Sequence, residues 1–286
     1  MQKKTKGVIC ILIAAFGFAM MSMFVRLAGP EISSFQKAFF RNLVALIIVS
    51  IIMAKTHISP KPERRNIGDL FCRALFGTLG LLCNFYAVDH LVLADATMLN
   101  KLSPFFAIII SVFLLKEKPN LVQMLGVFIA LGGSMLIIKP SFSNPELFPA
   151  IMGMLGGLGA GAAYTFVRKL GFKGENSMRI IFYFSSFSCI LCLPYLLLKY
   201  DPMTTTQLLY LICAGIFAAI GQFGITKAYL YAPAKEISVY DYTQVIFAAL
   251  LGLVFFGQIP DFLSIIGYML ICGAGVGMFM YNRSKE

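Results

Sequence analysis

Polar and charged side chains recur at helical spacing inside two long apolar segments. The first segment carries Thr97, Asn100, Lys101 and Pro104, which lie on one stripe of a helix. Positions 141 residues later carry Ser238, Asp241, Tyr242 and Val245. An amine, a carboxylate and several hydrogen-bonding groups can together bind a small polar molecule, so these two stripes are the first candidates for a site.

Catalytic and metal-binding patterns are not evident. The only histidines, His57 and His90, lie near the ends of apolar segments. Cys189 and Cys192 have metal-like spacing but lack a second pair or a nearby His, and all seven cysteines fall inside apolar segments, where thiols pack as small hydrophobes. The sequence therefore predicts no enzyme, no cofactor, no metal site and no disulfide framework.

The elements that carry these residues are membrane-spanning helices. The chain has 286 residues, of which 59% are hydrophobic and 13% charged, and its mean hydropathy is +0.82. A spanning helix needs about 20 apolar residues, whereas strands of a membrane barrel would alternate over about ten. We therefore expect an all-α integral membrane protein with ten transmembrane helices, near 7–27, 33–54, 69–89, 94–115, 120–138, 148–168, 178–198, 206–229, 235–256 and 262–281.

The basic residues predict an orientation. Lys and Arg gather in the N-terminal tail, after the second, fourth and sixth helices, and at the C-terminal end, which marks these segments as cytoplasmic. We therefore expect a protein of the cell (inner) membrane with both termini in the cytoplasm. This orientation requires an even number of helices, and ten satisfies it. The net charge of +11 is distributed between apolar segments, so it does not predict a nucleic-acid partner.

The chain contains an internal repeat. A shift of 142 pairs Gly17 with Gly159, and a shift of 141 keeps one register from Phe76, paired with Phe217, to Gly132, paired with Gly273. Each copy has five helices, an odd number, so the second copy crosses the membrane in the opposite direction. We expect two inverted repeats, 1–140 and 141–286, with a substrate site between them near the midplane.

The two polar stripes should meet at that midplane. Intramembrane charges usually face a bundle interior or a water-filled cavity. We expect Asp241 and Lys101 to be the principal charges of the cavity; a static buried ion pair is the alternative. Weaker candidates are an arginine, two amides and two tyrosines: Arg41, Asn84, Gln222, Tyr164 and Tyr240. Glycines at four-residue spacing, as in Gly153, Gly157 and Gly161, indicate close packing within the chain or, alternatively, a homodimer interface.

Several segments resemble the drug/metabolite transporter superfamily, specifically its ten-helix EamA-type members. They are AFFRN with Arg41, RALFGTLGLLCNFYAV, and LVLADATMLNKLSPFFAIIISVFLLKEKP with Pro104 and Glu117. The second copy departs from the pattern, with Val245 and Gln258 at the positions of the proline and the acidic residue. The resemblance implies a transporter of a small polar metabolite. SFQKAFFR is similar to a segment of S-adenosylmethionine transporters in this superfamily.

We therefore expect a secondary active transporter that works by alternating access. A cavity with both charge signs suits a zwitterion such as an amino acid or a derivative, and Asp241 is the candidate for proton coupling. The expected partners are the metabolite, the lipid bilayer, and protons or a counter-substrate, in a monomer or homodimer. A passive channel or facilitator is the alternative function.

Overall fold

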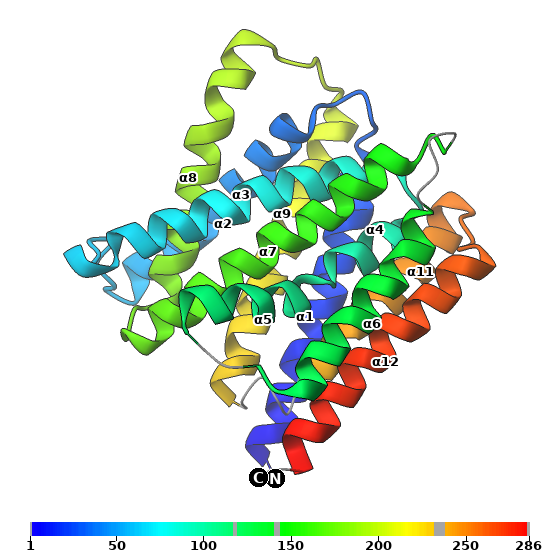
Figure 1. Cartoon of the computed structure of the whole chain (residues 1–286). Coiled ribbons are helices and arrows are strands. Elements are labelled where there is room, and N and C mark those ends of the chain that lie inside the picture. The colour runs from blue at the N-terminus through cyan, green and yellow to red at the C-terminus, as the bar shows by residue number, and fades with distance from the viewer. Residues whose placement is uncertain (1, 117–118, 140–143, 232–237, 285–286) are drawn as a thin grey trace.

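The computed structural model describes residues 2–116, 119–139, 144–231 and 238–284, apart from the side chains of 2–4, 226–227, 229–231, 238–239 and 282–284. Every regular element in these ranges is a helix (Figure 1). In chain order they are α1 (Gln2–Leu27), α2 (Ser34–Lys55), η1 (Arg64–Asn66), α3 (Ile67–His90), α4 (Leu93–Asn100), α5 (Ser103–Leu114), α6 (Leu121–Ile138), α7 (Leu147–Phe172), α8 (Ser177–Leu198), α9 (Thr205–Tyr231), η2 (Ser238–Tyr242), α11 (Thr243–Phe256) and α12 (Phe262–Ser284).

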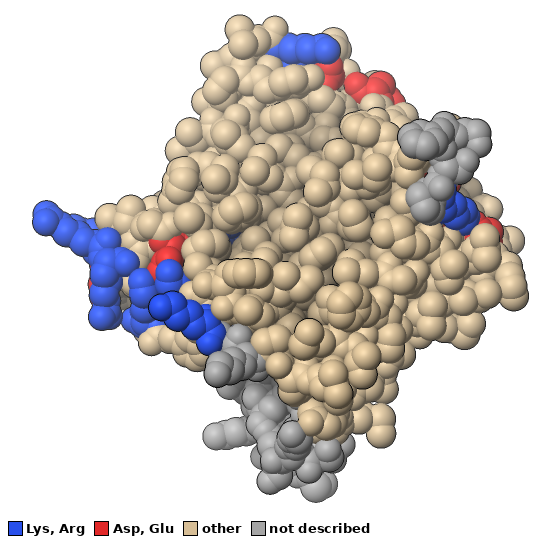
Figure 2. Space-filling view, viewed as in Figure 1, with Lys and Arg blue, Asp and Glu red and all other residues tan. Residues whose placement is uncertain are grey.

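The helices confirm the predicted all-α membrane fold. Within the described ranges, nine helical spans are long and apolar enough to cross a membrane, counting α4 and α5 together, and Tyr240–Phe256 is a shorter apolar helix. A broad uncharged surface covers the face shown in Figure 2, and most of the charged side chains visible there lie near its edges. The beginning of α1 and the end of α12 lie at the same end of the bundle in Figure 1.

One span is interrupted, and another changes its helix type. Residues 94–115, predicted as one helix, form α4 and α5 with a break at Lys101 and Leu102. Pro104 stands at the beginning of α5; it has no N–H to donate to the Asn100 carbonyl, and its ring disfavours a continuous helix there. In the span predicted near 235–256, the 3-10 helix η2 continues directly into α11, without a proline between them. The break in the first span and the change of helix type in the second both occur beside the polar residues of the two stripes.

The longest helices cross in two equivalent pairs. At the crossing of α1 and α9, a Cβ on Gly17 would lie 3.0 Å from the backbone nitrogen of Gly221. At the crossing of α7 and α3, a Cβ on Gly159 would lie 2.7 Å from the Cα of Gly80. The shifts of 142 and 141 pair Gly17 with Gly159 and Gly80 with Gly221. Helices of the two expected repeats therefore pack against each other at corresponding positions.

The glycine stripe of α7 packs within the chain. A Cβ on Gly157 would lie 2.6 Å from the carbonyl oxygen of Leu99, and one on Gly161 would lie 2.7 Å from that of Ser103. These positions lie on either side of the break between α4 and α5, so α7 supports that break through direct backbone contact. This packing accounts for the stripe without a homodimer.

A buried ion pair connects α2 with the end of α3. Lys37 Nζ lies 2.5 Å from Asp89 Oδ1, and the two side chains are 0% and 3% exposed. Beside this pair, Arg26 at the end of α1 donates to the carbonyl oxygens of Val88, at 2.8 Å, and Leu91. These contacts join α1, α2 and α3 at this end of the bundle.

Replacing Lys37 by Met is expected to lower the free energy of unfolding by about 3–5 kcal/mol, because it leaves the buried Asp89 carboxylate without its cation. The matched control is Lys173→Met: Asp69 also pairs with Lys169, and Lys173 is 32% exposed, so its loss should cost at most about 1 kcal/mol. Thermal unfolding in detergent measures both variants. Equal losses in the two would contradict this account of the Lys37 pair.

Candidate functional site

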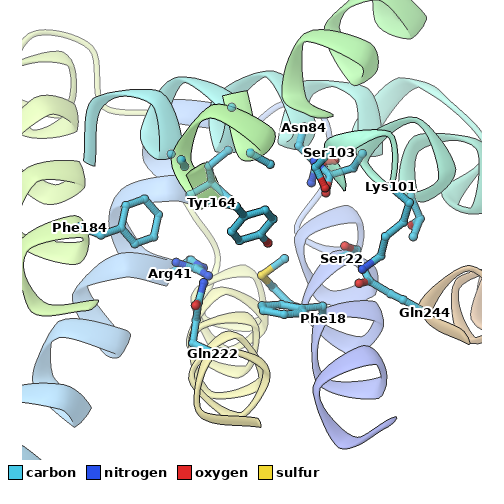
Figure 3. Close-up of a pocket in the computed structure, with 18 of the residues that line it drawn as sticks. Phe18, Ser22, Arg41, Asn84, Lys101, Ser103, Tyr164, Phe184, Gln222 and Gln244 are labelled. Atoms are coloured by element: carbon cyan, nitrogen blue, oxygen red, sulfur yellow. The ribbon is translucent and has the colours of Figure 1, made fainter. Parts of the chain in front are cut away.

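A polar cavity of about 100 Å³ lies between helices of both expected repeats (Figure 3). Helices α1, α2, α3, α7, α8 and α9 contribute to its wall, as do the segment around the break between α4 and α5 and the beginning of α11. Of the predicted site residues, seven line it: Arg41, Asn84, Thr97, Asn100, Lys101, Tyr164 and Gln222.

The structure brings Lys101 and Asp241 into contact. Lys101 Nζ donates to Asp241 Oδ2 at 2.6 Å, and the side chains are 8% and 17% exposed. Lys101 directly follows α4 and Asp241 lies in η2, so the pair joins the break between α4 and α5 to the 3-10 helix. Asp241 Oδ1 has no hydrogen-bond partner among the described groups. The carboxylate therefore keeps one free acceptor behind the cavity wall.

Two arginines occupy the cavity wall away from this pair. Arg41 is 2% exposed and Arg73 is 5% exposed. The Cζ atoms of Arg41 and Arg73 lie 5.8 Å and 4.0 Å from the centroid of the Phe184 ring, so both guanidinium groups contact one aromatic side chain. Figure 3 shows Arg41 and Lys101 on different sides of the cavity, with Tyr164 between them in this view.

Neutral polar groups complete the wall. Tyr164, which is 42% exposed, directs its hydroxyl into the cavity (Figure 3). The Asn84 side chain is buried, and its Oδ1 has no hydrogen-bond partner among the described atoms. The Thr97 hydroxyl instead donates to the Leu93 carbonyl one turn earlier, at 2.7 Å. The tyrosine hydroxyl and the amide are thus available to bind a ligand, whereas the Thr97 hydroxyl is already used within its helix.

Other predicted residues are not part of the cavity wall. Tyr242 follows Asp241 by one residue, which turns its side chain by about 120° in a 3-10 helix; it packs against Gly275 of α12, where an added Cβ would lie 2.6 Å from the tyrosine ring. Tyr240 is 37% exposed, and its carbonyl accepts a hydrogen bond from the Thr243 hydroxyl. Ser238 has its side chain outside the described part of the structure.

The prediction also missed residues that line the cavity: Ser22, Arg73, Ser103 and Gln244. Ser103 and Gln244 are related by the shift of 141, so the repeat itself could have identified them. Arg73 stands close to the beginning of its apolar segment, where an arginine usually extends to the membrane interface. Only the packing of α3 against α8 shows that it points inward.

Gly77 provides the space that Arg73 occupies. A Cβ on Gly77 would overlap Arg73 Nη1 and lie 3.0 Å from Phe184 Cε2. We expect Gly77→Ala to displace the guanidinium and weaken ligand binding about tenfold while the protein stays folded. The control is Gly68→Ala on the same helix, where an added Cβ meets nothing within 4 Å. Titration of any compound that stabilises the wild type tests this; equal affinity in both variants would contradict it.

Comparisons with known proteins identify the family of this chain. The EamA-like transporter family matches residues 5–139 and 147–280. The pseudopaline exporter CntI of Pseudomonas aeruginosa is 30% identical over 283 residues, covering 98% of this chain and 97% of that protein. Human solute carrier family 35 member G1 is 29% identical over 301 residues, covering 98% of this chain and 81% of that protein.

A solved crystal structure has the same fold. It covers 99% of both chains with a TM-score of 0.68 at 15% sequence identity. The family and the named relatives are transporters rather than enzymes. Together with the helical spans, these matches show that the chain is a multi-pass membrane transporter and belongs to the EamA-like transporter family of the drug/metabolite transporter superfamily.

Proposed function

We propose that the protein is a secondary active transporter that carries a small polar metabolite across the cell (inner) membrane by alternating access. The observation that carries this proposal is the Lys101–Asp241 pair, which joins the break between α4 and α5 to the 3-10 helix η2 beside a polar cavity. Interrupted helices at a repeat interface are the usual substrate site of secondary transporters. The substrate class we propose is a zwitterion, an amino acid or a derivative, with compounds similar to S-adenosylmethionine included.

The composition of the cavity wall supports two repeats, 1–140 and 141–286, of opposite orientation. Five pairs of lining residues are related by the shifts of 142 and 141: Phe18 with Ala160, Met21 with Ala163, Ser22 with Tyr164, Leu81 with Gln222, and Ser103 with Gln244. A cavity on a pseudo-twofold axis receives equivalent positions from both copies. A rocking motion about this axis would expose it to either side in turn, with both termini cytoplasmic.

Reconstitution in liposomes tests this function. Purified protein is screened for uptake of radiolabelled amino acids and their derivatives, with and without an imposed proton gradient. We expect accumulation above the external concentration for at least one compound when the gradient is present. Equilibration without accumulation, at any proton or counter-substrate gradient, would instead identify a passive facilitator.

Asp241 is the group through which we propose proton coupling. Its carboxylate has one oxygen on Lys101 and the other without a partner among the described atoms. Binding of a proton to that carboxylate would release the Lys101 amine toward the cavity. In liposomes, Asp241→Asn should therefore uncouple any remaining exchange of substrate from the proton gradient.

A further inference from the structure

The cavity wall carries more positive than negative charge. Its charged lining residues are Arg41, Arg73 and Lys101, and none of the described lining residues is an Asp or a Glu. Asp241 lies behind the wall and pairs with Lys101 at 2.6 Å. The charges of Arg41 and Arg73 therefore remain without a carboxylate among the described residues.

The neighbours of the two arginines orient them without neutralising them. Arg41 Nη1 donates to Asn42 Oδ1 at 2.6 Å, and Asn42 Nδ2 donates in turn to the Ala38 carbonyl at 2.8 Å. Phe184 contacts both guanidinium groups. The Nε atoms of Arg41 and Arg73 are buried and have no hydrogen-bond partner among the described groups. Both guanidinium groups are therefore held in place, and each keeps an N–H donor without a partner among the described groups.

Packing of the repeat fold does not require a cation at the Arg73 position. The shift of 141 that pairs Phe76 with Phe217 also pairs Arg73 with Ala214. Ala214 is fully buried in the apolar core of the second repeat. An arginine buried in a membrane is unfavourable unless an opposite charge or a set of acceptors compensates it. The compensating group for Arg41 and Arg73 must therefore come from outside the wall that the structure describes.

We propose that the substrate has a net negative charge and that its carboxylate or phosphate group binds to Arg41 and Arg73. Carboxylate and phosphate oxygens match the planar donor fork of a guanidinium. Asn84 Oδ1, an acceptor without a partner among the described atoms, then binds an N–H or O–H of the same molecule. This inference rests on the proposed transport function. It changes the expected substrate from zwitterions in general to compounds with an excess of acidic groups, with or without a cationic group, and it disfavours sulfonium compounds.

Thermal unfolding of the purified full-length chain tests the proposal. All seven cysteines are free, and Cys189 and Cys192 are buried, so a thiol-reactive dye reports unfolding. The panel consists of carboxylates (succinate, citrate and glutamate), a phosphate compound (3-phosphoglycerate), cations (lysine, putrescine and S-adenosylmethionine) and neutral compounds (glucose and glycine). We expect stabilisation by at least one anion. Comparison of the carboxylates with the phosphate compound shows which of the two acidic groups binds.

Variants locate the binding. Arg41→Gln and Arg73→Gln should each raise the dissociation constant of the stabilising anion at least tenfold, whereas Arg41→Lys and Arg73→Lys, which keep the charge, should retain part of the affinity. The control Arg64→Gln removes an equal charge from an exposed position in η1 and should leave affinity unchanged. The Lys variants keep the test valid if a Gln variant does not fold.

Two negative results differ in meaning. If the protein binds or transports only cationic or neutral compounds, with equal affinity in the wild type and the arginine variants, the anion proposal is overturned and the transport function stands. If liposomes show neither binding nor transport for any compound of the panel, the proposed function fails as well. An anion that binds equally to wild type and all arginine variants also overturns the assignment to Arg41 and Arg73.

Discussion

Asp241→Asn and Lys101→Ala are each expected to reduce transport at least a hundredfold while the protein still folds and inserts. The two side chains form a 2.6 Å ion pair between η2 and the end of α4. Removing one partner of a buried pair leaves an uncompensated charge, at a cost of about 3–5 kcal/mol. A variant would relieve that cost by closing or rearranging the cavity around the break, and either change prevents substrate from binding.

For each variant, the transport rate in liposomes and the amount of monodisperse protein extracted in detergent are both measured. The second measurement separates loss of function from loss of folding. The double variant Lys101→Met/Asp241→Leu removes both charges and should recover stability but not transport. If the pair is only a static packing contact, this double variant should transport at nearly the wild-type rate. That result would remove Lys101 and Asp241 from the proposed site.

A second control changes a cavity residue without changing charge. Gln244 lines the cavity from the beginning of α11 and is 7% exposed. Gln244→Ala should change affinity less than tenfold, because it removes a neutral group that has no partner across the cavity in the described contacts. A loss as large as that of Asp241→Asn would indicate that any substitution in the wall disrupts the site.

The fold could be predicted because the apolar composition of membrane-spanning helices is visible directly in the sequence. Each spanning helix needs a long apolar run, and the runs near 7–27 and 262–281 agree with α1 and α12 to within a few residues. The break between α4 and α5 and the 3-10 helix η2 were harder to predict. Pro104 gives a signal for the break, but Val245 stands at the corresponding position of the other span, where no residue type indicates the 3-10 geometry of η2.

The site could be predicted only in part, for a related reason. Lys101 and Asp241 could be predicted because each lies in a polar stripe at a related position of the expected repeats, and the structure places the two side chains in contact. Arg73 and the buried Lys37–Asp89 pair lie closer to helix ends, where sequence does not distinguish an inward side chain from one that extends to the interface. Their roles depend on which helix lies opposite, and the apolar pattern does not encode that.

Arg26→Gln is expected to open the cavity toward the outside of the cell. Arg26 Nη1 donates to the carbonyl oxygens of Val88 and Leu91, and its Cζ lies 5.2 Å from the centroid of the Phe256 ring. One side chain therefore joins α1, the segment between α3 and α4, and α11. Each hydrogen bond from a charged donor contributes about 1.5–3 kcal/mol, so losing them should raise the population of outward-open molecules tenfold or more.

A cysteine at position 22, one helical turn before Arg26, reports the opening of the cavity. Ser22 lies four residues before Arg26, lines the cavity and is 2% exposed. Intact cells carrying Ser22→Cys are treated with a membrane-impermeant thiol reagent, and mass spectrometry of the peptide that contains position 22 gives the modification rate. We expect slow modification in an otherwise wild-type chain and a rate at least tenfold higher when Arg26→Gln is added.

The repeat offers the matched control for this experiment. Arg168 follows Phe166 and Val167, which the shift of 142 pairs with Phe24 and Val25, and it lies at the opposite end of the bundle if the repeats are inverted. Arg168→Gln should therefore leave modification from outside unchanged. If Arg168→Gln raises the rate and Arg26→Gln does not, the proposed orientation of the termini is wrong. If neither does, the Arg26 contacts do not hold the cavity closed.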